Sequence, residues 1–64
     1  MFEMLDRVRD IKTGMLGTVL LITTGKDGRT IYTVEDDDWD LYEEPTDSLK
    51  EYYEDEIEFI AHTY

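Results

Sequence analysis

The sequence predicts a mainly β fold of the α+β class, a twisted antiparallel meander of about four strands followed by a C-terminal helix. Two observations lead to this prediction. Short runs rich in β-branched residues alternate with glycine-containing turns in the first half of the chain, and apolar residues recur with helical spacing in the last third. With 64 residues and no internal repeat, residues 1–64 are expected to form a single small domain.

The first strands are predicted from alternation and turn chemistry. Residues 5–11 follow the two-residue period of a strand, and a turn at 12–14 follows them. Residues 17–24 are rich in β-branched side chains, and the next four residues, Gly-Lys-Asp-Gly, are typical of a hairpin because glycine adopts positive φ. Residues 29–35 are therefore expected to pair back against this strand.

The next segment is expected to end that strand and to form another. Aspartates at 36–38 favour a turn, and residues 39–43 are predicted to be the fourth strand. Alternation along this strand would direct Trp39 and Leu41 inward and Tyr42 outward.

The C-terminal segment predicts a helix from about residue 48 to residue 62. Ser48 and Glu51 resemble a capping box after Pro45. Spacings of three and four residues separate most members of an apolar stripe: Leu49, Tyr52, Tyr53, Ile57, Ile60 and Tyr64. Residues 57–62 also alternate with a period of two, so a short helix followed by a final strand is the alternative.

Residues 5–8 (LDRV) lead through a turn to residues 17–19 (GTV) and a hydrophobic run that ends at Ile22. This pattern resembles the opening of small SH3-like barrels of the KOW type, in which a G-D-x-V strand precedes G-x-V. Residues 32–37 are similar to the third strand of that family. The resemblance implies an SH3-like barrel over about residues 5–38. It departs from the family at Leu5, where glycine is common, and in the acidic C-terminal third, since KOW modules that bind RNA or ribosomal partners are basic.

Charge is polarised along the chain. Of the 17 acidic residues, 13 lie between Glu35 and Glu58, where Lys50 is the single cation, whereas the first 32 residues carry five cations and four acids. A net charge of -11 exceeds what solubility requires and destabilises the compact state by self-repulsion. Direct binding to nucleic acid is not expected, because phosphate contacts depend on Lys and Arg.

The sequence predicts neither an enzyme nor a cofactor. The single histidine, His62, is two residues from the end of the sequence, where chains commonly fray, and so small a domain has little room for a shaped cleft. No apolar run approaches the ~20 residues of a membrane span. The absence of cysteine suits a reducing compartment, so a cytoplasmic protein without membrane contact is expected.

Metal binding is also not predicted, although several acids fit part of an EF-hand frame. Leu41 stands where the frame requires glycine, and Pro45 interrupts it. A solvated acidic loop is therefore the preferred interpretation of the residues that fit: Asp36, Asp38, Asp40, Glu44 and Asp47.

Two functional hypotheses begin from the acidic half. In the first, the chain occupies the nucleic-acid site of a basic protein of the restriction, CRISPR or repair class; its size and charge are similar in type to phage-encoded DNA-mimic inhibitors. The predicted partner-binding residues are Asp36, Asp37, Asp38, Asp40, Tyr42, Glu43, Glu44, Asp47, Glu51, Glu54 and Asp55.

In the second hypothesis, an SH3-like module docks to a protein through exposed aromatic residues, such as Tyr42 or Tyr53, and a sheet edge, while the charge serves solubility. A homodimer is a further expectation under either hypothesis. Three successive apolar residues at 20–22 cannot all face one core, and a short barrel leaves an edge.

Overall fold

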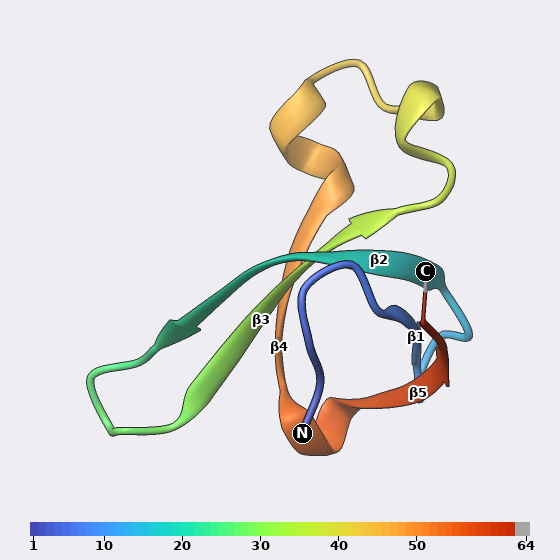
Figure 1. Cartoon of the computed structure of the whole chain (residues 1–64). Coiled ribbons are helices and arrows are strands. Elements are labelled where there is room, and N and C mark those ends of the chain that lie inside the picture. Colours follow the sequence, from blue (N-terminus) through green and yellow to red (C-terminus); the bar gives the residue numbers. More distant parts are fainter. Residues whose placement is uncertain (63–64) are drawn as a thin grey trace.

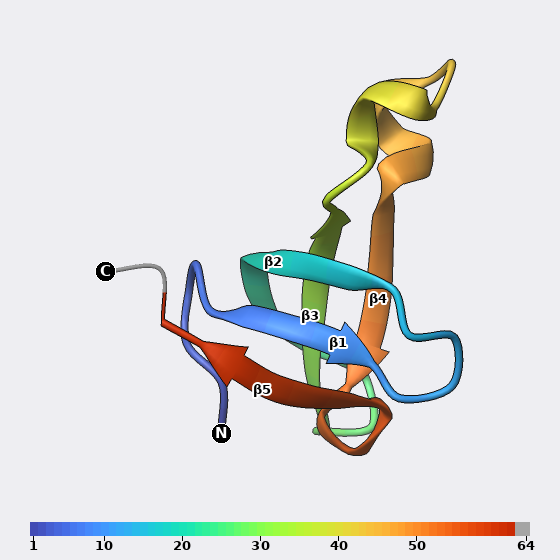
Figure 2. The same ribbon diagram turned by 90° about the vertical axis from the view of Figure 1, so that its right-hand side faces the viewer.

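The computed structural model describes residues 1–62 and contains one five-stranded antiparallel sheet (Figures 1 and 2). The strands are β1 (Arg7–Asp10), β2 (Leu16–Thr24), β3 (Thr30–Asp36), β4 (Leu49–Tyr53) and β5 (Ile57–Ala61). Their spatial order is β4-β3-β2-β1-β5, so the first four strands form a meander and the fifth returns to pair with β1. The prediction of a mainly β fold is confirmed.

The two turns that join the first three strands lie where the sequence predicted them. Between β1 and β2, Gly14 adopts φ +80° and donates its N–H to the carbonyl oxygen of Asp10 at 2.8 Å. Between β2 and β3, Gly25 donates its N–H to the carbonyl oxygen of Arg29 at 2.8 Å, and Gly28 adopts φ +83°. In these two turns the positive-φ positions are glycines because a Cβ would be strained there.

The predicted C-terminal helix is wrong. Residues 49–61 form β4, a single 3₁₀ turn (η3, Glu54–Glu56) and β5. Ser48 does not cap a helix; it is buried and donates its hydroxyl to the carbonyl oxygen of Pro45 at 2.8 Å. The apolar residues recur at spacings of three and four because the segment joins two strands through a three-residue turn. The two-residue alternation of the first strand is therefore out of step with that of the second. The alternative with a final strand is correct for β5, and Tyr64 lies outside the described residues.

The predicted fourth strand at 39–43 is also wrong. This segment contains the 3₁₀ turn η1 (Trp39–Leu41), and a second one, η2 (Pro45–Ser48), follows it. Trp39 and Leu41 do not point inward, since they are 57% and 77% exposed. Residues 37–48, which we call the acidic excursion, stand away from the strands in both views (Figures 1 and 2).

The core is small and comes from four of the five strands. Its buried apolar residues are Val8, Val19, Tyr32, Val34 and Ile57, with Phe2, Met15, Ile22 and Tyr52 packed against them. A bulge in β2 between Val19 and Leu21 changes the alternation of the strand. It leaves Leu20 and Ile22 partly buried and Leu21 half exposed, which is how three successive apolar residues are accommodated.

The chain before β1 also contacts the sheet. Leu5 donates its N–H to the carbonyl oxygen of Val19 at 2.7 Å, and Val19 donates to the carbonyl oxygen of Asp6 at 2.9 Å. Leu5 has φ +68°, a left-handed conformation that is rare for a branched side chain. In the described part of the chain, no helix is long and apolar enough to cross a membrane.

Candidate partner-binding surface

The acidic excursion carries the largest group of exposed acids. Its backbone is folded locally: Leu41 donates to the carbonyl oxygen of Asp38 at 2.9 Å, and Asp47 donates to that of Glu44 at 3.0 Å. Six of its carboxylates are exposed, and five of the six form no ion pair with another described residue: Asp38, Asp40, Glu43, Glu44 and Asp47. These five predicted residues therefore lie exposed on one projecting segment of the chain.

Asp36 and Tyr42 hold the base of the excursion together. Asp36 is 8% exposed and accepts the N–H of Asp38 at 3.0 Å and the hydroxyl of Tyr42 at 2.7 Å. These two bonds lower the pKa of Asp36, and the bond to Asp36 raises the pKa of Tyr42. The Lys50 ammonium lies 5.3 Å from the centroid of the Tyr42 ring. The two predicted residues are thus bonded to each other, with Asp36 buried and Tyr42 only partly exposed instead of pointing fully outward.

Asp37 is occupied by an arginine of β1. The Arg7 guanidinium donates two bonds to the Asp37 carboxylate, one of them at 2.6 Å from Nη1 to Oδ1, and Nη1 also donates to Thr18 at 2.9 Å. The bond to Asp37 raises the pKa of Arg7. A second arginine, Arg9, binds Glu58 of β5, with Nε 2.6 Å from Oε1. These arginines neutralise Asp37 at the start of the excursion and Glu58 on β5, and they leave the other acids of the excursion unneutralised.

The remaining predicted acids lie along β4 and in η3. Glu51 is exposed on β4. Glu54 accepts the Tyr32 hydroxyl at 3.0 Å, and Asp55 lies 3.5 Å from the Arg29 guanidinium. Since η2 and η3 flank β4, this strand separates the two acidic groups; a five-residue strand spans about 17 Å.

Sequence reasoning missed a cluster of Glu3, Asp6 and His62. Asp6 is 3% exposed, accepts the N–H of Glu3 at 2.9 Å, and lies 2.7 Å from Nδ1 of His62. The bond from Glu3 lowers the pKa of Asp6. One potential metal-ligand atom from each of the three residues lies within 4.8 Å of the others. No sequence signal pairs residues 56 positions apart, so only the folded chain brings this cluster together.

Asp10 is a second buried acid that the sequence did not single out. Its carboxylate accepts the N–H groups of Lys12 at 2.8 Å and Thr13 at 3.1 Å, and the hydroxyl of Tyr52 at 2.9 Å. Burial raises the pKa of Asp10, but these bonds outweigh it and the net shift is downward. A tyrosine of β4 is thereby tied to the β1–β2 turn.

The arrangement as a whole is a projecting acidic surface with two exposed apolar side chains, joined by β4 to a second acidic group. The five unpaired acids of the excursion can bind a cationic partner without first losing internal ion pairs. No protein-family model, no curated protein and no solved structure matches the chain.

Proposed function

We propose that this chain is a non-enzymatic acidic binding protein that occupies the nucleic-acid site of a basic protein, in the manner of DNA-mimic inhibitors of restriction, CRISPR or repair enzymes. The observation that carries the proposal is the set of five exposed carboxylates on the acidic excursion that form no ion pair within the described residues. Charge placed in this way steers a cationic partner toward the surface. When no partner is bound, the same charge lowers the stability of the fold through self-repulsion.

The charge density supports this proposal. Each strand of B-DNA carries about one charge per 3.4 Å of axis, so a duplex as long as the longest extent of this chain, 33 Å, carries about ten charges on one strand. The chain offers nine exposed acids over β4 and the segments at its two ends: Asp38, Asp40, Glu43, Glu44, Asp47, Glu51, Glu54, Asp55 and Glu56. The two numbers are similar enough for the phosphates of one strand to be imitated.

The architecture that would hold these acids is, in our proposal, an SH3-like barrel of the KOW type. Two features support it. The last of five antiparallel strands returns to the first, and Leu5 adopts φ +68° at the position where the KOW pattern commonly has glycine. A scaffold of this kind supplies rigidity, which a competitor of DNA requires.

A protein-interaction module is the second candidate, and the exposed apolar residues of the excursion favour it. Trp39 and Leu41 are 57% and 77% exposed in the same excursion as the five acids. Large apolar side chains commonly act as interface anchors, and apolar contacts are little affected by salt. The salt dependence of binding therefore distinguishes the two candidates.

Variants in which two acids are replaced by their uncharged amides test the proposal. The protein is immobilised, exposed to cytosolic lysate and eluted in steps of increasing salt. We expect basic nucleic-acid-binding proteins to elute with salt, and their capture to fall about tenfold in the Asp40→Asn/Glu44→Gln variant, a change of about 1.4 kcal/mol.

The matched control, Glu3→Gln/Asp27→Asn, removes two exposed acids outside the excursion and should retain capture. Equal loss in both variants would show a dependence on net charge alone and would contradict the proposal. Salt-resistant capture that requires Trp39 would favour the interaction module.

A further inference from the structure

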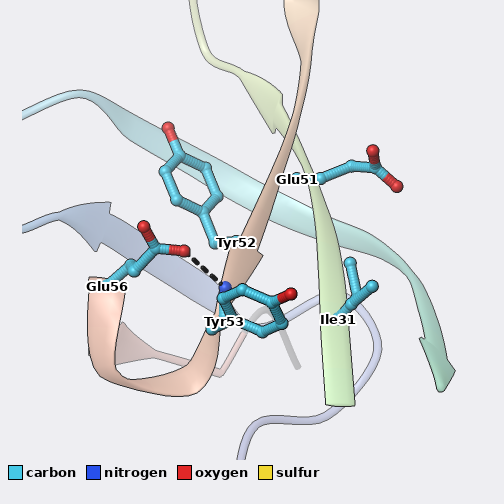
Figure 3. Close-up of a pocket in the computed structure, with 5 residues that line it drawn as sticks. All are labelled: Ile31, Glu51, Tyr52, Tyr53 and Glu56. Atoms are coloured by element: carbon cyan, nitrogen blue, oxygen red, sulfur yellow. Dashed lines mark hydrogen bonds between the residues drawn. The ribbon is translucent and has the colours of Figure 1, made fainter. Parts of the chain in front are cut away.

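A hollow of about 170 Å³ lies beside the end of β4, an edge strand of the sheet (Figure 3). Ile31, Glu51, Tyr52, Tyr53 and Glu56 line it. A water molecule takes about 30 Å³ in the liquid, so the hollow has room for several waters or for a small planar group.

The residues around the hollow combine an apolar surface with two carboxylates. Ile31 and Tyr53 are cross-strand partners, so their side chains lie on the same face of the sheet, and Glu51 shares that face because it precedes Tyr53 by two residues. Figure 3 shows Tyr52 directed away from them, on the side of Glu56. Glu56 is held in place by the backbone N–H of Tyr53, which donates to Oε1 at 2.8 Å.

A guanidinium group of the chain itself already packs against the Tyr53 ring. Arg29 packs over this ring with Cζ 3.6 Å from the ring centroid, and its Nη2 lies 3.5 Å from Oδ1 of Asp55. These residues line a neighbouring hollow that also includes Tyr53 but not Ile31 or Glu51. In the neighbouring hollow, an arginine of the chain itself therefore stacks on Tyr53 beside an acid. The hollow beside Ile31 also borders Tyr53 and acids, but no arginine among the described residues lines it.

We propose that the hollow beside Ile31 and Tyr53 receives an arginine side chain of the basic partner. The guanidinium would pack against Tyr53 and donate hydrogen bonds to Glu51, which shares that face of the sheet, while Glu56 adds negative charge on the other side of the hollow. Arginine fits better than lysine because its planar, weakly hydrated group stacks on aromatic rings and donates in a fixed fork. This inference deepens the proposed function and rests on it for the class of partner, but the hollow can be tested without that partner.

The test uses N-acetyl-arginine amide as the probe, with the citrulline analogue as an uncharged control of nearly the same shape. Amide signals of the ¹⁵N-labelled protein are followed by NMR during titration at low salt. We expect shifts at Ile31 and residues 51–56, and about two- to fivefold tighter binding of the arginine probe, in line with 0.5–1 kcal/mol for an exposed cation–π contact. Equal binding of both probes would overturn the inference.

Variants of the residues that line the hollow test whether the arginine probe binds there. Glu51→Gln should weaken arginine binding about two- to fivefold, since Glu51 is exposed and its loss leaves the fold intact. Tyr53→Leu should remove the shifts, whereas Tyr53→Phe should retain them because the ring face remains. If Tyr53→Leu does not fold, the change in arginine binding of Glu51→Gln alone decides whether the probe binds in the hollow.

The matched control is Glu3→Gln, which removes one exposed acid outside both the hollow and the excursion and should leave arginine binding unchanged. Shifts centred on the Arg29 side chain or on the excursion would place the probe elsewhere and contradict the inference. Because the probe requires no partner, failure here leaves the proposed role of the excursion standing, and failure of lysate capture leaves the hollow intact.

Discussion

At the scale of single residues, three buried aspartates organise the turns of this acidic chain. Asp6, Asp10 and Asp36 each accept at least one backbone N–H and one further side-chain hydrogen bond. They differ in this respect from the exposed acids of the excursion. The chain thus uses its carboxylates in two ways, as internal hydrogen-bond acceptors and as free surface charge.

Asp10 offers a direct test of the first use. Asp10→Ala should lower the free energy of unfolding by about 1–3 kcal/mol, because the Lys12 and Thr13 N–H groups and the Tyr52 hydroxyl lose their acceptor. Asp10→Asn should cost less, because its amide oxygen can still accept from the turn. Urea unfolding measures both, and equal costs would mean that the carboxylate acts through charge and not through geometry.

The same aspartates set the response to acid. Hydrogen bonds hold the pKa values of Asp6, Asp10 and Asp36 below the ordinary 3.8. The unfolded chain therefore binds more protons than the folded one in this range, and stability falls as pH falls through the folded values. We expect the melting temperature to drop steeply below about pH 4. An unchanged melting temperature down to about pH 2 would contradict the assignment.

Leu5 carries backbone strain that a glycine would remove. At an ordinary position alanine is more stable than glycine by about 0.5–1 kcal/mol, but a left-handed conformation costs other residues about 1–2 kcal/mol. At φ +68° we therefore expect Leu5→Gly to be more stable than Leu5→Ala. Thermal unfolding of the two variants measures the difference, and the usual order would show that Leu5 is not held in that conformation.

At the scale of elements, Gly17 determines how closely β2 and β3 pack. A Cβ on Gly17 would lie 2.5 Å from Cγ1 of Val34 and 2.6 Å from the carbonyl oxygen of Glu35. Gly17→Ala should cost about 1–3 kcal/mol by overpacking. Gly28→Ala is the matched comparison, because its φ is positive but a Cβ there meets no atom within 4 Å. A smaller loss at Gly17 than at Gly28 in urea unfolding would contradict this account.

The elements that the sequence predicted are those with local causes. Glycine turns at 12–14 and 25–28 define β1, β2 and β3, and the turn residues themselves form the bonds that close them. β4 and β5 depend on distant partners: Tyr52 pairs with Tyr32, and Ile57 pairs with Asp10. A periodicity of three to four residues is ambiguous in so short a segment, and tertiary pairing decided it.

At the scale of the whole molecule, self-repulsion should limit stability. Neutralising the five acids of the excursion, as in Asp38→Asn/Asp40→Asn/Glu43→Gln/Glu44→Gln/Asp47→Asn, should raise the melting temperature by several degrees at low salt. The difference should vanish near 1 M salt, where the screening length is about 3 Å. Calorimetry at the two salt concentrations measures this effect, and a lower melting temperature for the variant would mean that these acids support the fold.

The candidate surface was predictable in composition and only partly in geometry. Counting charges located the acidic half, and the excursion contains seven of the eleven predicted residues, five of them exposed acids without an ion pair in the described part of the chain. The sequence could not distinguish Asp36 and Asp37 from their neighbours, because the hydroxyl of Tyr42 and the guanidinium of Arg7 occupy them only in the folded chain. Whether an acid forms an ion pair depends on which residues the fold brings next to it. Arg7, the partner of Asp37, is 30 positions away in the sequence.

Displacement by DNA tests the central claim most directly. Partners captured from lysate on the immobilised protein are challenged with a short DNA duplex at constant ionic strength, and their release is measured. If the acidic surface occupies a nucleic-acid site, the duplex will release the bound proteins while an equal concentration of an uncharged polymer will not. Partners that stay bound at saturating duplex would show that protein and DNA use different sites, and would contradict the claim.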